Sequence, residues 1–394
     1  MRQSSLKKLI LLLIVTLVLG GVYLYTRPLP QIAPIAQTPV SVKAQAVALP
    51  WPASNQAAIG AKEYGILDTQ NINTPVSIAS VAKIIVAMAV LQEKPLSLGQ
   101  QGPIITLDNQ DLDYYNYYYL NDGSVAKVET NEKISEYQAL QALLLPSANN
   151  FADSLARWAF GSQTAYTTYA NKMLKDMGLT KTSVVGPSGY ADDAKSTADD
   201  LVKIGLASLN NAVISQVVGQ QSATIPVAGE VKSTNWLLGS NGVIGIKTGN
   251  TDQAGGCYLF ASSRRVEGHT VTLVGAILGT VSLTAAISST PDLLAAADSG
   301  FSAVVPVHKG QVIGQYKTPW DTQANAIAKK DVSLLAWKGR DIKILNTLNS
   351  VAVPATAGDL VGQITVKNGD LAVGTAAVLS QDLGSPPWIW RLFH

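Results

Sequence analysis

The chain has 394 residues, 14 % of them charged, and a formal net charge of +2 at pH 7. The charges are spread without a basic stripe, so the sequence indicates no nucleic-acid partner. The single cysteine, Cys257, excludes an internal disulfide, and none of the three histidines lies in an H-E-x-x-H or Cys/His pattern. We therefore expect no metal, no other cofactor and no Ser-His-Asp triad, and the length leaves room for two domains.

The N-terminal segment is the first predicted element. Residues 9–25 are apolar and uncharged, and as a helix they span about 26 Å, which is enough to cross a bilayer core. Three basic residues precede them, which keeps the N-terminus in the cytoplasm and places everything after it outside. Residues 1–26 are a membrane anchor or a signal peptide, and the late A-x-A pattern at 44–46 favours the anchor. The Pro-, Ala- and Gln-rich residues 27–50 predict an extended tether.

The segment around Ser80 carries the first of three short motifs, S-x-x-K. Residues 81–91 are apolar without Gly or Pro, which predicts a buried helix with Ser80 at its N-terminal end. The spacing places Ser80 and Lys83 on one face, about one turn apart. A serine becomes a good nucleophile when a base takes its proton, and burial, the helix dipole and a second lysine all favour the neutral amine that Lys83 would need. The alternative is an N-cap serine followed by a surface lysine.

A tyrosine-rich stretch follows at residues 113–119, with the sequence DYYNYYY. Exposed tyrosines can stack on sugars or line a peptide groove. The alternative, which we favour, is a loop or strand partly packed on the core.

The second motif is S-x-N, formed by Ser147 and Asn149. It follows a predicted helix at residues 135–145 and precedes another, which indicates a tight polar turn between two helices. There Ser147 can pass a proton between Lys83 and a leaving nitrogen, and Asn149 can hold a substrate amide. An ordinary capping turn is the alternative, because Ser and Asn favour such positions.

The third motif is K-T-G, formed by Lys247, Thr248 and Gly249 at the end of a β-branched run that predicts a strand. Lys247 and Thr248 can bind a carboxylate, and Gly249 lets a ligand backbone approach closely. The backbone N–H groups of Ser80 and Asn250 can form an oxyanion hole. Alone, this motif is equally compatible with an edge strand that ends in a turn.

The three motifs occur in this order within residues 51–303, a length that suits one domain. Predicted strands at both ends of this region enclose a helical middle, in which Ser196 caps a further helix. This order predicts an α+β domain with an antiparallel sheet covered by helices. In combination, the motifs are typical of a serine acyl-enzyme site that uses lysines and no histidine.

Residues 304–382 predict a small all-β module of short strands, with Asn368-Gly369 as a hairpin dipeptide that favours a type I′ turn. The tail, residues 383–394, is aromatic. It can touch a membrane interface or pack back on the β module, and the sequence does not separate the two.

With these motifs, the chain resembles the low-molecular-mass penicillin-binding proteins, which are serine D-alanyl-D-alanine carboxypeptidases of the DacA type. The resemblance covers roughly residues 50–380 and includes the strings GPSGY at 186–190 and NWLL at 235–238. It implies a penicillin-binding or serine β-lactamase-like transpeptidase fold followed by a β-sandwich. Two departures are Ala82, where the family often has Thr, and Thr234, where some members have a basic residue.

The resemblance also implies a role for each motif residue. Ser80 would be the nucleophile and Lys83 the base, with Ser147 and Asn149 as the second motif. The terminal carboxylate of the substrate would be bound by the third motif, whose residues are Lys247, Thr248 and Gly249.

The implied reaction is hydrolysis of the terminal D-Ala-D-Ala bond of peptidoglycan stem peptides outside the cell membrane, with β-lactams as inhibitors. One alternative is a DD-endopeptidase of the same superfamily, because the motifs are shared. A class A β-lactamase is disfavoured, because residues 150–200 contain no E-x-x-L-N string. A non-catalytic wall-binding scaffold is the alternative from another class.

Overall fold

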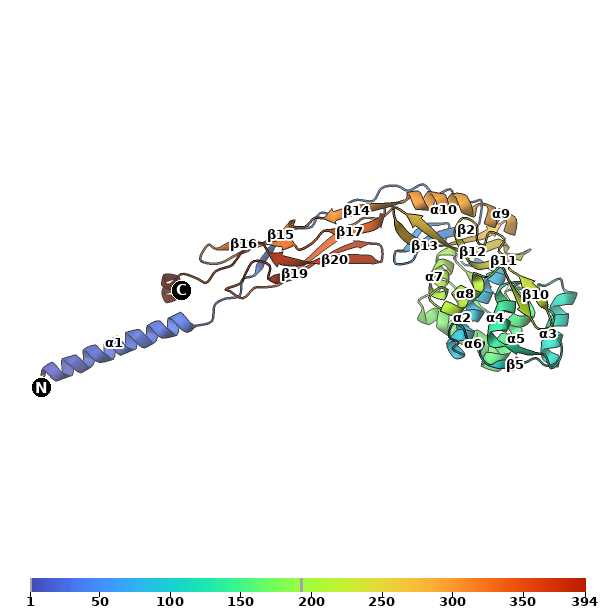
Figure 1. The fold of residues 1–394 in the computed structure, drawn as a ribbon, viewed down its shortest axis with the longest axis horizontal. Helices are drawn as coiled ribbons and strands as arrows, with labels where there is room; N and C mark the ends of the chain where they lie inside the picture. The colour runs from blue at the N-terminus through green and yellow to red at the C-terminus, as the bar shows by residue number, and fades with distance from the viewer. Residues whose placement is uncertain (1, 192–193) are drawn as a thin grey trace. The chain divides into compact units, whose positions relative to one another are not determined.

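The computed structural model describes residues 2–191 and 194–394 (Figure 1). It divides into two compact units, each built from more than one stretch of the chain. The β unit comprises residues 1–44, 303–336 and 340–394, and the mixed unit comprises residues 45–302 and 337–339. In sequence, the mixed unit is therefore inserted into the β unit.

The mixed unit is built on a five-stranded antiparallel sheet with the strand order β11-β12-β13-β2-β3. These strands are β2 (Gln56–Ala61), β3 (Gly65–Gln70), β11 (Val243–Thr251), β12 (Gly255–Val266) and β13 (His269–Thr280). All six residues of β2 are buried, because helices pack on the sheet (Figure 1). A Cβ on Gly60 would lie 2.7 Å from Val202 Cγ1 of helix α7 (Ala198–Ser208), so glycine is required for this close packing. The predicted α+β fold is confirmed.

Most helices of the mixed unit lie between β3 and β11 in sequence. They are the 3₁₀ turn η1 (Ala79–Ala82), α2 (Lys83–Glu93), α3 (Asn109–Leu120), α4 (Glu136–Leu144), α5 (Asn149–Phe160), α6 (Gln163–Asp176), α7 and α8 (Ala212–Val218), while α9 (Leu283–Ser288) and α10 (Thr290–Ser299) follow β13. Helix α2 contacts α4, α5, α6 and α7, and most of its side chains are buried. The expected buried helix after Ser80 is confirmed.

Short strands, which form one three-stranded sheet and two pairs, lie among these helices, between β3 and β11 in the sequence. They are β4 (Val76–Ser77), β5 (Ile104–Thr106), β6 (Lys133–Ser135), β7 (Ser183–Val184), β8 (Ala194–Ser196), β9 (Ser222–Ile225) and β10 (Gly229–Lys232). They pair as β4-β8-β7, β5-β6 and β9-β10.

Two local predictions in this region are wrong. Residues 113–119 form part of helix α3 and not a loop or strand, because Asp108 and Asp111 make a complete capping box that starts the helix. Ser196 is not a helix cap. It is the last residue of β8, and Thr197 is the N-cap of α7.

The β unit contains a six-stranded sheet with the order β1-β15-β16-β20-β19-β18 and a separate pair, β14-β17. Its strands are β1 (Pro34–Ala36), β14 (Phe301–Val307), β15 (Val312–Lys317), β16 (Gln323–Ala328), β17 (Val332–Trp337), β18 (Lys343–Leu348), β19 (Leu360–Asn368) and β20 (Leu371–Leu379). The expected hairpin between β19 and β20 is confirmed, but its turn type differs. Asn368 pairs with Leu371, so the turn residues are Gly369 and Asp370, and of these two only Gly369 has a positive φ, as in a type II′ turn.

Part of the segment 27–50, whose composition predicts an extended tether, pairs with the β unit. Residues 34–36 form β1, which pairs with β15 at the edge of the six-stranded sheet. Ile32 and Val42 form further isolated bridges, and Ile32 is buried in the β-unit core. Prolines are compatible with this arrangement because an edge strand leaves one side of its backbone unpaired.

Helix α1 (Arg2–Thr26) includes the apolar stretch Leu6–Thr26, which has a mean hydropathy of 2.4. The most apolar part of this stretch is not buried by the rest of the protein. This is one helix long and apolar enough to cross a membrane, and a signal sequence has the same properties.

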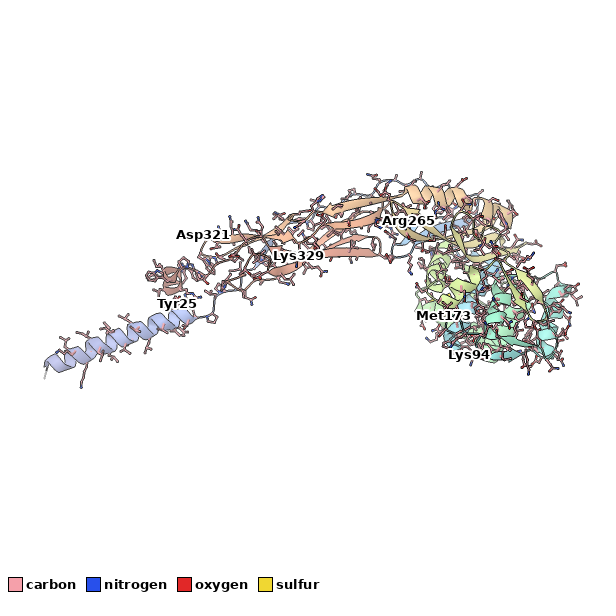
Figure 2. The ribbon with its side chains drawn as sticks, in the orientation of Figure 1. Tyr25, Lys94, Met173, Arg265, Asp321 and Lys329 are labelled. Atoms are coloured by element: carbon pink, nitrogen blue, oxygen red, sulfur yellow. The ribbon has the colours of Figure 1, made fainter. Side chains whose placement is uncertain are left out.

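The aromatic tail ends in the short helix α11 (Trp388–Phe393). Trp390 packs edge-on against Trp320 of the β unit at 4.9 Å, which agrees with the alternative that the tail packs back. The Arg391 guanidinium lies 5.1 Å from the ring of Tyr25, which Figure 2 labels near the end of α1. Trp388 remains 64 % exposed, so only part of the tail is covered.

Candidate active site

Ser80 and Lys83 meet at the start of α2. Ser80 lies within the 3₁₀ turn η1, and Lys83, which is fully buried, is the first residue of α2. Lys83 Nζ lies 2.8 Å from Ser80 Oγ, 2.7 Å from Asn149 Oδ1 and 2.6 Å from the backbone oxygen of Ser188. The alternative of a surface lysine is therefore excluded, and three oxygen atoms surround the amine.

The second motif forms the predicted turn between two helices, α4 and α5. Ser147 has a left-handed φ of 66°, and Asn149 begins α5 with its backbone N–H donating to Ser124 O at 2.7 Å. This turn directs the Asn149 amide oxygen at Lys83. Ser147 is buried, and its hydroxyl makes no hydrogen bond within residues 2–191 and 194–394.

The third motif lies on β11, as predicted. Lys247 is buried, and its amine donates to Thr248 O at 3.0 Å. Burial lowers the pKa of Lys247 to about 7, because an ammonium group is poorly stabilised away from water. Thr248 Oγ1 lies 2.5 Å from Thr234 Oγ1. Thr234, a departure from the family pattern, is thus in direct contact with the motif.

Gly249 is the place where the first and third motifs touch. A Cβ at Gly249 would lie 3.0 Å from the Ser80 backbone nitrogen and 3.0 Å from Ile78 O. The predicted approach of a ligand backbone to Gly249 stays a prediction; the close neighbour in the structure is the chain's own turn η1. Because of this packing, β11 runs directly beside the backbone of Ser80.

A cavity of about 540 Å³ opens over these residues. Ser80, Asn149 and Asn250 line it, which brings one predicted residue from each of the three motif regions to a single cleft. The remaining lining residues are Asn121, Asp122, Gly123, Ser124, Tyr190, Ala191, Thr251, Asp252 and Gln253. Lys83, Ser147 and Lys247 are buried and do not line the cavity, and Lys83 contacts the lining residues Ser80 and Asn149.

The loop at residues 186–190 also belongs to the site, which the sequence did not predict. Ser188 contributes a backbone carbonyl to Lys83, and such a contact leaves no signature in the residue type. Gly189 was the available signal. It has a φ of +68°, and a Cβ there would lie 2.1 Å from Ala79 O, so only glycine lets this loop press against η1.

Cys257 lies on β12, directly opposite Gly249. The thiol is buried, and burial raises its pKa to about 11. The thiol therefore stays protonated at neutral pH and is not a nucleophile.

The antiparallel sheet and its helical layer are those of the penicillin-binding fold, and a serine that is hydrogen-bonded to a buried lysine lines its cavity. A family model described as D-alanyl-D-alanine carboxypeptidase matches residues 44–278. The chain therefore belongs to the D-alanyl-D-alanine carboxypeptidase family of serine peptidases.

Individual relatives agree with this assignment. The chain is 30 % identical to a D-alanyl-D-alanine carboxypeptidase of a Streptomyces species, over 56 % of this chain and 78 % of the relative. It is 27 % identical to a D-alanyl-D-alanine endopeptidase of Pseudomonas aeruginosa, over 54 % of this chain and 67 % of the relative. The crystal structure of PBP3, a peptidoglycan synthesis regulatory factor of Streptococcus pneumoniae, shares the fold with a TM-score of 0.62 at 20 % identity, covering 84 % of this chain and 99 % of that one.

Proposed function

We propose that Ser80 is the nucleophile that attacks the carbonyl carbon of the penultimate D-alanine of a peptidoglycan stem peptide. Its Oγ–C bond forms as the peptide C–N bond breaks, and the terminal D-alanine leaves with a proton on its nitrogen. Water then hydrolyses the acyl-enzyme and restores the hydroxyl. The observation that carries this proposal is the 2.8 Å contact between Ser80 Oγ and the Lys83 amine at a cavity.

Lys83 is the base in this proposal, because its amine is the basic group bonded to Ser80 Oγ. The Ser147 hydroxyl, buried and without a hydrogen-bond partner in the described chain, is available to relay the proton to the leaving nitrogen. Asn149 orients Lys83 and lines the cavity where the substrate amide would lie. The backbone N–H groups of Ser80 and Asn250 are the proposed oxyanion donors, each worth about 2.7–4 kcal/mol in the transition state.

Lys247 would bind the terminal carboxylate together with Thr248 and Gly249. Its lowered pKa supports this role, because an anion that binds next to a buried amine strongly stabilises the charged form of that amine. A carboxylate at this position would restore the full charge of Lys247 and pair with it. The requirement for a free chain end would distinguish a carboxypeptidase from enzymes that cut within a chain.

Helix α1 bears on the location of the chain. We propose that residues 1–26 anchor the chain in the cell membrane and that residues 51–303, the catalytic domain, act on its outer side. The apolar stretch Leu6–Thr26 and the basic residues before it support this placement. Residues 304–382 would be the accompanying β domain and residues 383–394 its tail.

The test is product analysis with purified protein. Wild type is expected to release free D-alanine from a stem pentapeptide and to be labelled covalently by a fluorescent penicillin. Ser80→Ala should lose both, whereas Ser97→Ala, an exposed serine on the loop after α2, should lose neither. Labelling of Ser80→Ala would show that the nucleophile is a different residue.

The relative from Pseudomonas aeruginosa makes endopeptidase activity the second candidate. The same purified protein should therefore be given a cross-linked muropeptide dimer. Cleavage of the dimer in preference to D-alanine release would assign the endopeptidase reaction. Absence of both reactions, together with the absence of penicillin labelling, would favour a wall-binding scaffold.

A further inference from the structure

The tyrosine-rich helix α3 reaches the loop that holds Lys83. Tyr118 is buried, and its hydroxyl donates to Ser188 Oγ at 3.2 Å. The Ser188 side chain also accepts the Tyr190 backbone N–H at 3.2 Å. The rings of Tyr118 and Tyr190 meet edge to face at 5.4 Å, so the hydroxyl contact is supported by ring packing.

The same loop is fixed from its other side. Gly189 packs so closely against η1 that a Cβ would lie 2.1 Å from Ala79 O. Tyr190 OH donates to the backbone oxygen of Asn121, the residue that directly follows α3. Gly189 and Tyr190, the two residues that follow Ser188, are therefore both held in place. The Ser188 backbone carbonyl lies 2.6 Å from Lys83 Nζ.

The position of this carbonyl matters because of the geometry of an amine. A neutral lysine amine has two N–H bonds and one lone pair. Ser188 O and Asn149 Oδ1 only accept hydrogen bonds, so they take the two N–H bonds. The third position of the amine is at Ser80 Oγ, to which the charged form donates an N–H; when Lys83 is neutral, this position can hold the lone pair that receives the serine proton.

We propose that Tyr118 is a positioning residue for the acyl-transfer reaction. Through the Ser188 side chain it fixes the Ser188 carbonyl, and that carbonyl aims the lone pair of Lys83 at Ser80. Tyr118 does not line the cavity, so its effect falls on proton abstraction and not on substrate binding. The inference rests on the proposed nucleophile and base.

The experiment measures D-alanine release and the rate constant of penicillin acylation in full-length Tyr118→Phe, which keeps the ring and removes only the hydroxyl. We expect kcat and the acylation rate constant to fall about tenfold, with KM within about twofold of wild type, because misplacement of a catalytic group costs rate before it costs binding. The matched control is Tyr119→Phe, a tyrosine of the same helix that is 62 % exposed, and it should behave as wild type.

A second variant separates positioning from general stability. Ser188→Ala removes the other half of the hydrogen bond and should reproduce the loss, and the double variant should be no slower than either single variant. Losses that multiply in the double variant, or a Tyr118→Phe enzyme with wild-type kcat, would overturn the inference. If wild type releases no D-alanine and is not acylated, the proposed function fails instead, so the two failures are distinguishable.

Discussion

Lys83 and Lys247 are both buried lysines in one site, yet their surroundings differ. Lys83 is bonded to three oxygen atoms from three segments, those of Ser80, Asn149 and Ser188. The only hydrogen bond described for Lys247 goes to the carbonyl of its neighbour Thr248, and burial lowers the pKa of Lys247 to about 7. Within the described residues, Lys83 thus has hydrogen-bond partners from three segments, whereas the hydrogen bond of Lys247 is made to its neighbour in the chain.

This difference separates two uses of an amine. A proton acceptor needs a fixed direction, which a full set of hydrogen bonds gives it. An amine that binds a carboxylate should be poorly stabilised by the protein itself, so that the charge of the ligand stabilises its ammonium form. Substitution of each lysine tests whether Lys83 acts as the base and Lys247 binds the carboxylate.

The largest effect is expected from Lys83→Met, which keeps the length of the side chain and removes the base. Penicillin acylation should slow by about 10³-fold or more, because the serine then has no group to take its proton. Stopped-flow acylation kinetics measure this. Lys94→Met, at the far end of α2 (Figure 2), is the matched control and should acylate normally.

Lys247→Met should reduce activity and raise stability. We expect kcat/KM for a stem pentapeptide to fall about 10²-fold, because the carboxylate loses its cationic partner. The free energy of unfolding should rise by on the order of 3 kcal/mol near neutral pH, because a buried amine with one partner is costly. Denaturant titration and steady-state kinetics on the same preparation measure both, and a variant less stable than wild type would contradict the prediction.

The pH dependence of that stability gain has a definite sign. In the folded chain Lys247 has a pKa of about 7, whereas its ordinary value is 10.5. Between these values the unfolded state binds more protons, so the stability of wild type rises with pH across this window. The advantage of Lys247→Met should therefore be greatest at or below pH 7 and shrink toward about pH 10. An advantage that is constant with pH would mean that Lys247 stays charged.

Gly249→Ala tests the contact between strand β11, which carries Lys247, and the turn η1, which carries Ser80. The new Cβ would meet the Ser80 nitrogen and Ile78 O at 3.0 Å, and backbone atoms can give way only by moving the turn that carries Ser80. We expect acylation to fall about 10- to 100-fold with the fold intact, as judged by circular dichroism. Gly384→Ala has open space around it and is the control.

The smallest effect is expected from Thr234→Val, which removes the hydroxyl contact to Thr248 while keeping the branched shape. KM should rise about threefold with kcat nearly unchanged, because a hydrogen bond that only supports the carboxylate pocket is worth about 1 kcal/mol. Thr234→Ser keeps the hydroxyl and should restore KM. A loss in kcat alone would place Thr234 nearer to the chemistry than we propose.

The local structure around both lysines could largely be predicted from the sequence. An apolar run without Gly or Pro predicted the burial of α2, and with it the burial of Lys83. A β-branched run predicted the strand of Lys247, and the S-x-N spacing predicted a turn between helices. In each case the signal lies in side chains next to one another along the chain.

What the sequence did not reveal depends on backbone atoms and distant pairing. The Ser188 carbonyl has no residue signature, and the tyrosine stretch was misassigned because its helix is set by the capping box at Asp108 and Asp111. The composition of residues 27–50 predicts an extended tether, and it does not reveal that β1 pairs with β15. Such contacts are decided by tertiary packing, which overrides local composition.

The pairing of β1 with β15 has a consequence for biosynthesis. Pro34 emerges from the ribosome early, but its partner Tyr316 follows only roughly 280 residues later, so a large loop must close before this edge forms. The intervening unit is nearly continuous in sequence and can complete its own sheet first. The β unit should therefore assemble last, once the final strands have been synthesised.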